Sequence, residues 1–247
     1  MLAEVNNAAR SSHWQRFLVD QSWTTFTPDD HAVWDELFAR QMQLLRGRVV
    51  SPFFEGVDEL GLRDPGVPNL SRLNERLVER TGWRCVSVAG LVPDEAFFAM
   101  LAARLFPIGN FIRSRTQMDY LKEPDCFHDI FGHVPMLADP RMASAMRSVG
   151  EFGLEAIASG EGQVVARLYW HTVEFGLCKE DGELRILGAG LASSFGEARA
   201  SLEDPSIDRR PFTFEAATAS PYRHDAMQPL YFVSDSFDSA IAALHRR

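Results

Sequence analysis

Residues 123–135 read Glu-Pro-Asp-Cys-Phe-His-Asp-Ile-Phe-Gly-His-Val-Pro, and this stretch holds two histidines, His128 and His133, five positions apart. On an α-helix five residues amount to about 140° of rotation, so the two rings would diverge, unlike the four-residue pair of a zinc protease. Long imidazole side chains can still converge on one ion beside the helix. Gly132 lets another element or a ligand approach closely, and Pro135 stops the helix beyond the second histidine.

The polar groups of this stretch need partners if the segment is buried. His128, Asp129 and His133 stand among phenylalanine, isoleucine and valine, and burying an unpaired polar group costs roughly 2–7 kcal/mol. A histidine pair in a helix can be purely structural, with each ring satisfied inside the core. The functional alternative is a metal ion, which would satisfy both imidazoles at once.

A third ligand is needed, and Glu174 is the natural candidate because it interrupts the apolar run 168–177. The alternative is a polar stripe, since Arg167, His171 and Glu174 share a helix face. His171 is then a further possible ligand, although a polar face or a supporting contact explains it equally well. Two histidines and one carboxylate give the facial arrangement of non-haem iron(II), which leaves positions open for oxygen and a co-substrate.

Composition excludes several classes of protein. The chain has 247 residues, 46% of them hydrophobic, which is enough for one large domain without a disulfide or metal staple. The 24% of charged residues excludes disorder, and the sequence has neither an 18-residue apolar run nor a signal peptide. A net charge of −9 excludes a nucleic-acid partner, because phosphate binding needs a basic face.

The three cysteines, Cys85, Cys126 and Cys178, form no CxxC pair. They indicate a reducing cytoplasm rather than a disulfide scaffold or a structural zinc site, and each is expected to be a small buried residue.

Helix signals dominate the chain, and it contains no internal repeat and no linker. We expect one domain over residues 27–247, preceded by an arm, residues 1–26, that lies on it. Helix caps and apolar periodicity predict helices at about 27–45, 70–80, 93–105, 139–160, 163–178, from 194 onward, and 236–245. Strand signals are few: 184–187, 212–214 and 230–233. The pattern predicts a mainly α-helical fold with a few short strands.

These residues resemble the pterin-dependent aromatic amino acid hydroxylases, and within them the bacterial branch that acts on phenylalanine. The resemblance runs from about Phe26 to Phe237. It rests on the segments 26–34, 81–83, 90–91, 111–113, 123–135, 169–177, 188–190 and 193–194. The chain has no room for the N-terminal regulatory domain of the animal members and ends without their oligomerising helix, so we expect a monomer.

The resemblance implies a metal and a cofactor site. The iron(II) ligands of the family match His128, His133 and Glu174. A tetrahydropterin is expected to stack on an aromatic ring, beside a loop whose backbone reads the pterin edge. The matching residues are Gly90, Leu91 and Val92 for the loop, Phe97 for the ring, Asp129 for a contact through water, and Tyr169 near both the pterin and the iron.

The resemblance also implies an amino-acid pocket. Arg113 would hold the substrate carboxylate as a bidentate fork, braced by Asp125, and Ser193 would add a hydrogen bond to that carboxylate. The residues expected around the substrate ring are Phe106, Pro124 and Trp170. Leu121 replaces a polar residue of the animal enzymes, which leaves one substrate contact in doubt.

The expected activity is hydroxylation of L-phenylalanine to L-tyrosine with O2 in the cytoplasm. Val233 favours phenylalanine, because tyrosine-specific members tend to carry an acidic residue there. The alternatives are a tyrosine or tryptophan hydroxylase of the same family, a zinc-dependent hydrolase that uses the same three ligands, and a non-catalytic binding protein that kept the fold. The sequence offers no separate general base for a hydrolase, and the intact ligand set argues against a binding protein.

Overall fold

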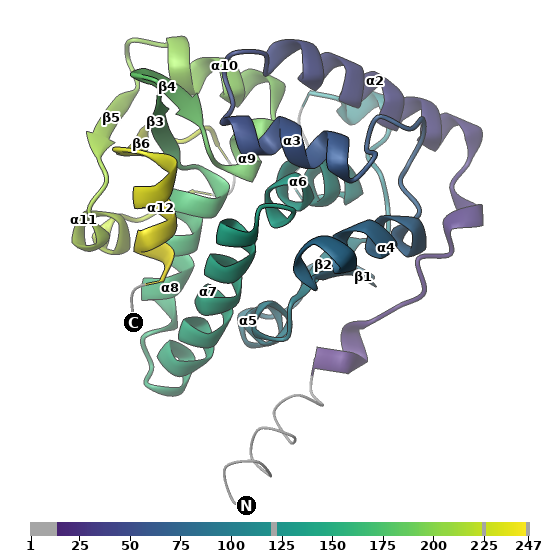
Figure 1. The fold of residues 1–247 in the computed structure, drawn as a ribbon, viewed down its shortest axis with the longest axis horizontal. Helices are drawn as coiled ribbons and strands as arrows, with labels where there is room; N and C mark the ends of the chain where they lie inside the picture. The colour runs from purple at the N-terminus through teal and green to yellow at the C-terminus, as the bar shows by residue number, and fades with distance from the viewer. Residues whose placement is uncertain (1–13, 120–122, 224–225, 246–247) are drawn as a thin grey trace, which may run out of the picture.

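A long helix, α7 (Pro140–Ala158), runs through the middle of the molecule, and the other elements pack around it (Figure 1). The computed structural model describes residues 14–119, 123–223 and 226–245. The further α-helices in this part of the chain are α2 (Pro28–Leu44), α3 (Ser51–Glu59), α4 (Leu70–Thr81), α5 (Asp94–Ala102), α6 (Val134–Leu137), α8 (Gly162–Tyr169), α9 (Ala189–Ser193), α10 (Phe195–Glu203), α11 (Phe214–Ala219) and α12 (Phe237–Leu244). The mainly α-helical fold expected from the sequence is confirmed.

Short polar signals set the helix ends. The Thr27 side chain accepts from the backbone of Asp30, and the Asp30 side chain accepts in return from the backbone of Thr27, which caps the start of α2. Asp139 caps α7 by accepting from the amides of Arg141 and Met142. Helix α4 ends where Gly82 adopts a φ of 76°, a left-handed conformation that favours glycine. The helix starts and stops expected at these positions are confirmed.

In the described part of the chain, six short strands form two sheets. Their bounds are β1 (Arg84–Val88), β2 (Leu105–Gly109), β3 (Leu177–Glu180), β4 (Glu183–Ile186), β5 (Asp208–Pro211) and β6 (Leu230–Ser234). Strands β1 and β2 pair in parallel, and the second sheet has the order β4-β3-β6-β5. The strands expected at 184–187 and 230–233 are confirmed within one residue. The strand expected at 212–214 is wrong, because the Thr213 side chain accepts from Ala216 N and starts helix α11 at Phe214.

The two sheets lie on different sides of α7, with β1, β2 and α4 on one side and the four-stranded sheet on the other (Figure 1). Helices α5, α8 and α12 all contact α7. Close approach of α5 requires glycine on α7, because a Cβ at Gly150 would overlap the backbone of Ala102 and one at Gly153 would overlap the ring of Phe98. Within the described residues, no helix is long and apolar enough to cross a membrane.

Residues 14–26 contact the body through a few hydrogen bonds. Val19 N donates to Ser87 O on β1, and Trp23 Nε1 donates to Val67 O at 2.7 Å. Residues 1–13 lie outside the described part of the chain. The division into an arm and a single domain therefore stays a prediction.

Three segments converge to form the candidate site. Helix α9 packs against residues 128–133, and α8 continues directly into residues 170–174. Strand β2 contacts residues 128–133 from the side of the smaller sheet. The candidate ligands therefore come from two helical segments that α9 and β2 hold in place.

Candidate metal centre

Both ligand-bearing segments are π-helical turns. His128–His133 forms one such turn (η4) and Trp170–Glu174 the other (η5). A π-turn hydrogen-bonds each residue to the fifth one along, so residues five apart lie near one another, and such turns are frequent at functional sites. The divergence expected for two histidines on an α-helix is therefore wrong.

Two features of the sequence favour the π-turn of η4. Pro135 has no amide hydrogen, and a proline ring clashes with the carbonyl four residues back, so the regular α-helical ladder cannot pass this point unchanged. Gly132 lies against α9, where a Cβ would come within 2.9 Å of Ala189 O. The helix thus meets α9 at the turn that carries both histidines.

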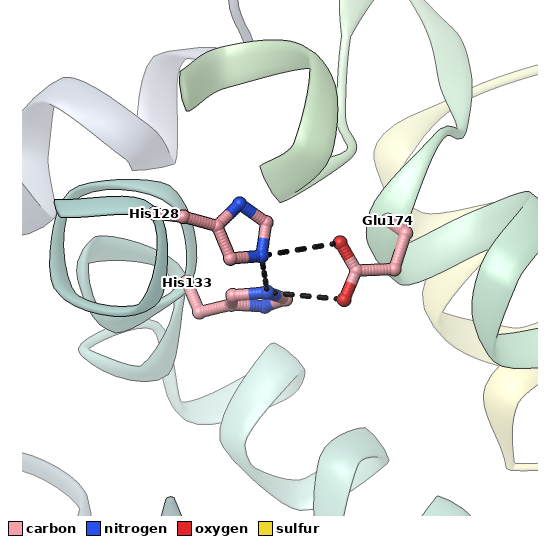
Figure 2. A group of neighbouring side chains, drawn as sticks. All are labelled: His128, His133 and Glu174. Carbon is pink, nitrogen blue, oxygen red and sulfur yellow. Dashed lines mark hydrogen bonds and ion pairs between the residues drawn. The ribbon is translucent and has the colours of Figure 1, made fainter. Parts of the chain in front are cut away.

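The imidazoles of His128 and His133 converge on the carboxylate of Glu174, as Figure 2 shows. His133 Nε2 lies 3.2 Å from one Glu174 oxygen, and His128 Nε2 lies 3.7 Å from the other. The two Nε2 atoms are 3.3 Å apart. All three side chains are largely buried. The two Nε2 atoms and the Glu174 carboxylate lie around one point, at which they can bind a metal ion.

Electrostatics hold His128 and Glu174 in the protonation states that bind a metal. Burial lowers the pKa of His128 to about 4, which leaves a neutral imidazole at pH 7. Burial alone would raise the pKa of Glu174, but the two imidazoles bring it to about 2, so the carboxylate is charged. Metal ligands must be deprotonated in this way.

Ser193 supports His128 from the opposite side of the ring. Its Oγ lies 2.8 Å from His128 Nδ1 and also donates to Ala189 O at 2.8 Å. Ser193 is therefore close to the candidate centre. The hydrogen bond expected from Ser193 to a substrate carboxylate stays a prediction, and it would require the hydroxyl to give up its bond to Ala189 O.

Tyr169, one of the residues expected at the pterin, lies beside His133, and Phe97, another of them, packs against Tyr169. The Tyr169 ring lies 6.3 Å from the His133 ring, and the Phe97 ring packs edge-on against Tyr169 at 5.3 Å. Burial raises the pKa of Tyr169, and the nearby Glu174 carboxylate raises it further. Among the described residues, the buried Tyr169 hydroxyl has no hydrogen-bond partner of ordinary geometry. A polar group bound beside Glu174 would supply that partner.

The loop expected to read the pterin edge, residues 90–92, connects β1 to α5 and is open to solvent. Leu91 is 72% exposed, and a Cβ at Gly90 would meet nothing within 4 Å. Asp129 lies closer to the centre and accepts from Gly109 N at 2.7 Å. Burial raises the pKa of Asp129 to about 7.

Arg113 and Asp125 form a buried bidentate pair. Arg113 Nε and Nη2 donate to the two Asp125 oxygens, each at 2.8 Å, and Arg113 N donates to the same carboxylate. Burial alone would raise the pKa of Asp125, but the Arg113 guanidinium holds it below its ordinary value. Among the described residues, no acceptor reaches Arg113 Nη1. Asp125 also accepts from His128 N at 3.1 Å, which links the pair to the histidines.

The three residues expected around a substrate ring lie on different elements. Phe106 is buried on β2 with its ring 4.8 Å from the His133 ring. Pro124 is half-buried just before η4. Trp170 starts η5, and its indole packs on Phe175 at 4.6 Å. Leu121, where the sequence departs from the animal pattern, lies outside the described residues.

Some neighbours of the site were not expected from the sequence. Tyr222 stacks on Trp170 with ring centroids 4.4 Å apart, and the buried Gln228 accepts from the Trp170 indole at 3.3 Å. A lone glutamine just before the apolar strand 230–233 was the available signal. His171 is buried against Ser220 O and is not one of the converging ligands.

The donor set fits a mononuclear metal. Two imidazoles and one carboxylate lie on the same side of one point, with the buried Tyr169 hydroxyl near the carboxylate. This is the facial triad of non-haem iron(II) proteins, although catalytic zinc can use the same ligands. The fold and the site together define a mainly helical, mononuclear metal-binding protein.

Comparisons with known proteins identify the family. Residues 19–246 match the model of the biopterin-dependent aromatic amino acid hydroxylases, and the chain belongs to this family. It is 48% identical over 221 residues to the phenylalanine-4-hydroxylase of Caulobacter vibrioides, covering 90% of this chain and 75% of that one.

Two solved structures of Chromobacterium violaceum phenylalanine hydroxylase share the fold. One, with bound iron(III) and 7,8-dihydrobiopterin, is 43% identical with a TM-score of 0.89 and covers 92% of this chain and 83% of that chain. The other, with iron and phenylalanine bound, is 40% identical with a TM-score of 0.88 and covers 94% and 84%. The family membership expected from the sequence is confirmed.

Proposed function

We propose that this chain is a phenylalanine 4-hydroxylase, which converts L-phenylalanine and O2 into L-tyrosine with iron(II) and a tetrahydropterin. The observation that carries the proposal is the facial set of His128, His133 and Glu174 in a chain of this family. The same donor set could hold zinc in a hydrolase, but relatives with bound iron and dihydrobiopterin favour the hydroxylase.

The residues hold the metal as follows. His128 and His133 present Nε2 atoms, and Glu174 presents its carboxylate. When bound, iron(II) and tetrahydropterin supply the oxygen activation and the electrons that hydroxylation by O2 requires, since no side chain has that chemistry. The protein supplies a face of three ligands and buried aromatic walls that keep water away.

The amino-acid substrate is held by its charge and by its ring. Arg113 Nη1 is the group available to the substrate carboxylate, and Asp125 fixes the orientation of the guanidinium. Phe106, Pro124 and Trp170 supply the surroundings of the ring. The apolar Val233 supports phenylalanine over tyrosine, because it gives a phenolic hydroxyl no partner.

We place the pterin beside Phe97 and Tyr169. Phe97 supplies a ring for stacking, and the open backbone of Gly90, Leu91 and Val92 supplies donors and acceptors. Asp129 and Tyr169 complete the set. We assign these residues to the pterin because they are the positions that match the pterin site of the family.

A cytoplasmic location is part of the proposal. It is supported by three cysteines that are free and buried, as expected in a reducing compartment. The expected monomeric state remains a prediction, which sedimentation at micromolar concentration would test.

The experiment compares kcat/KM for phenylalanine, tyrosine and tryptophan in iron-loaded protein with a tetrahydropterin. The kcat/KM should be highest for phenylalanine. It should exceed that for tyrosine by up to about 100-fold, because an apolar pocket rejects an added hydroxyl only to that extent. Equal efficiency for all three amino acids would contradict the assignment to phenylalanine.

A further inference from the structure

Gln228 is a buried amide whose polar atoms all have partners. Its Nε2 donates to Arg223 O at 2.7 Å and to Ala226 O at 3.1 Å. Its Oε1 accepts from Trp170 Nε1 at 3.3 Å and from Arg223 N at 3.4 Å. One side chain therefore ties the backbone of the segment before β6 to the indole that begins η5.

Gln228 is itself held in place by Glu197 on α10. The Glu197 carboxylate is buried and accepts from Gln228 N at 2.9 Å and from the Tyr231 hydroxyl at 2.8 Å. Helix α10 begins at Phe195, two residues after Ser193, which contacts His128. Gln228 thus connects helix α10 with the indole of Trp170.

Tyr222 directly precedes Arg223, whose backbone Gln228 contacts. The ring of Tyr222 stacks on Trp170 with an angle of 17° between the planes. Two residues before Tyr222, Ser220 O lies 3.2 Å from His171 Nε2. Two hydrogen-bonded anchors, one before and one after Tyr222, therefore keep this ring against Trp170.

Trp170 and Glu174 share the five residues of η5. A shift of the Trp170 indole therefore occurs at the opposite end of the turn from the metal ligand, where it can change the pocket wall without removing a ligand. The chemistry at position 228 also requires an amide. A glutamate there could accept from Trp170 but could not donate to two carbonyls, and its charge would lie beside Glu197.

We propose that Gln228 is a positioning residue for the amino-acid pocket: it holds Tyr222 against Trp170 and so sets the aromatic wall that receives the substrate ring. This inference rests on the proposed function, because it takes Trp170 as part of that pocket. It predicts that changes at this position alter capture of the amino acid and leave the metal and the pterin unaffected.

The first test is Gln228→Glu in the iron-loaded full chain. The KM for phenylalanine should rise about tenfold, because small displacements of positioning groups have effects of that order or larger. The KM for tetrahydropterin and the iron content should stay within twofold of wild type. Isothermal titration calorimetry of phenylalanine into the iron(II) protein should show an affinity for phenylalanine that is also about tenfold lower.

The matched control is Gln21→Glu. The side-chain amide of Gln21 also bonds the backbone at both of its polar atoms, donating to Pro68 O and accepting from Leu70 N. Gln21 lies on the N-terminal segment and contacts neither Trp170 nor Tyr222 through these bonds. This variant should keep the wild-type KM for phenylalanine. An unchanged KM and affinity in folded Gln228→Glu, or an equal rise in both variants, would overturn the proposal.

A second variant covers the case in which Gln228→Glu does not fold. Tyr222→Leu removes the stacked ring from a half-buried position and leaves the buried amide in place. It should also raise the KM for phenylalanine about tenfold with no change in iron content. A KM within twofold of wild type would reject the role of this wall. Failure of the wild-type protein to form tyrosine would instead reject the proposed function itself.

Discussion

Ser193 determines which nitrogen of His128 faces the metal position. The Ser193 hydroxyl has one hydrogen, which it donates to Ala189 O, so it must accept from His128 Nδ1. The hydrogen of the neutral imidazole is then on Nδ1, and Nε2 carries the free lone pair that points toward Glu174. A hydrogen bond outside the ligand set thus selects the tautomer that can bind a metal.

Ser193→Ala should weaken iron binding by about 10–100-fold, the usual effect of removing a hydrogen bond that orients a ligating histidine. A competition titration of iron(II) against a chelator measures this directly. Ser201→Ala is the matched control, because Ser201 is buried and donates to Ala198 O but touches no ligand. Equal iron affinity in wild type and Ser193→Ala would show that the tautomer is fixed by something else.

Arg113→Ala should weaken capture of phenylalanine by about one to two orders of magnitude, since a hydrogen bond to a charged group contributes about 1.5–3 kcal/mol. Removing one partner of a buried ion pair can also destabilise the fold by about 3–5 kcal/mol. Arg113→Lys therefore accompanies it, because lysine keeps the charge and loses the planar fork.

The measurement is the KM for phenylalanine and for tetrahydropterin in both variants, with Arg115→Lys as the control. Arg115 is exposed and pairs with Asp29 and Glu36 on the surface. If Arg113→Lys matches wild type in the KM for phenylalanine, the planar guanidinium has no part in substrate binding.

Gly132→Ala should destabilise the protein by about 1–3 kcal/mol, because a Cβ there would lie 2.9 Å from Ala189 O and 3.2 Å from Ala189 Cβ. The strain would displace α9, which carries Ser193, so iron affinity should fall as well. Urea unfolding and iron titration test both effects. Gly196→Ala is the control, since its Cβ would meet only the flexible end of Met227. A Gly132→Ala protein with wild-type stability would refute the tight contact.

Asp139→Ala should cost about 1 kcal/mol of stability at pH 7, the usual effect of losing a helix cap. Burial alone would raise the pKa of Asp139, but its hydrogen bonds with Arg141 hold it below its ordinary value. Its charge therefore contributes stability above the ordinary aspartate pKa, and that contribution is lost as the pH falls through the lower, folded pKa.

Urea unfolding at pH 7 and pH 3 measures this difference for Asp139. The difference in the free energy of unfolding between wild type and Asp139→Ala should be smaller at pH 3 than at pH 7. Asp139→Asn keeps the capping oxygen without the charge, so its free energy of unfolding at pH 7 should lie between those of wild type and Asp139→Ala. A gap that widens on acidification would contradict the sign of the pKa shift.

Local signals in the sequence predicted much of the helical fold. Thr27, Asp139 and Gly82 act on the backbone next to them, so their effect can be read without knowledge of the tertiary structure. Strands β1 and β2 were missed because their pairing is parallel and joins Arg84 to Leu105 across helix α5. Such pairing depends on contacts distant in the sequence.

The ligand set could be found from polar residues in apolar segments, but its geometry could not. The sequence implied diverging rings, whereas the π-turn that brings His128 and His133 together depends on the packing of Gly132 against α9. The contacts of Gln228 with Trp170 were equally inaccessible, because they join a loop to a helix 58 positions earlier.

The most direct test of the account is product formation by metal-substituted protein. Purified chain is loaded with iron(II) or with zinc, and tyrosine and oxygen consumption are measured with phenylalanine, with and without a tetrahydropterin. The account predicts tyrosine only from the iron(II) form with pterin, because zinc has no redox change to offer. Tyrosine from the zinc form, or from the iron(II) form without pterin, would contradict it.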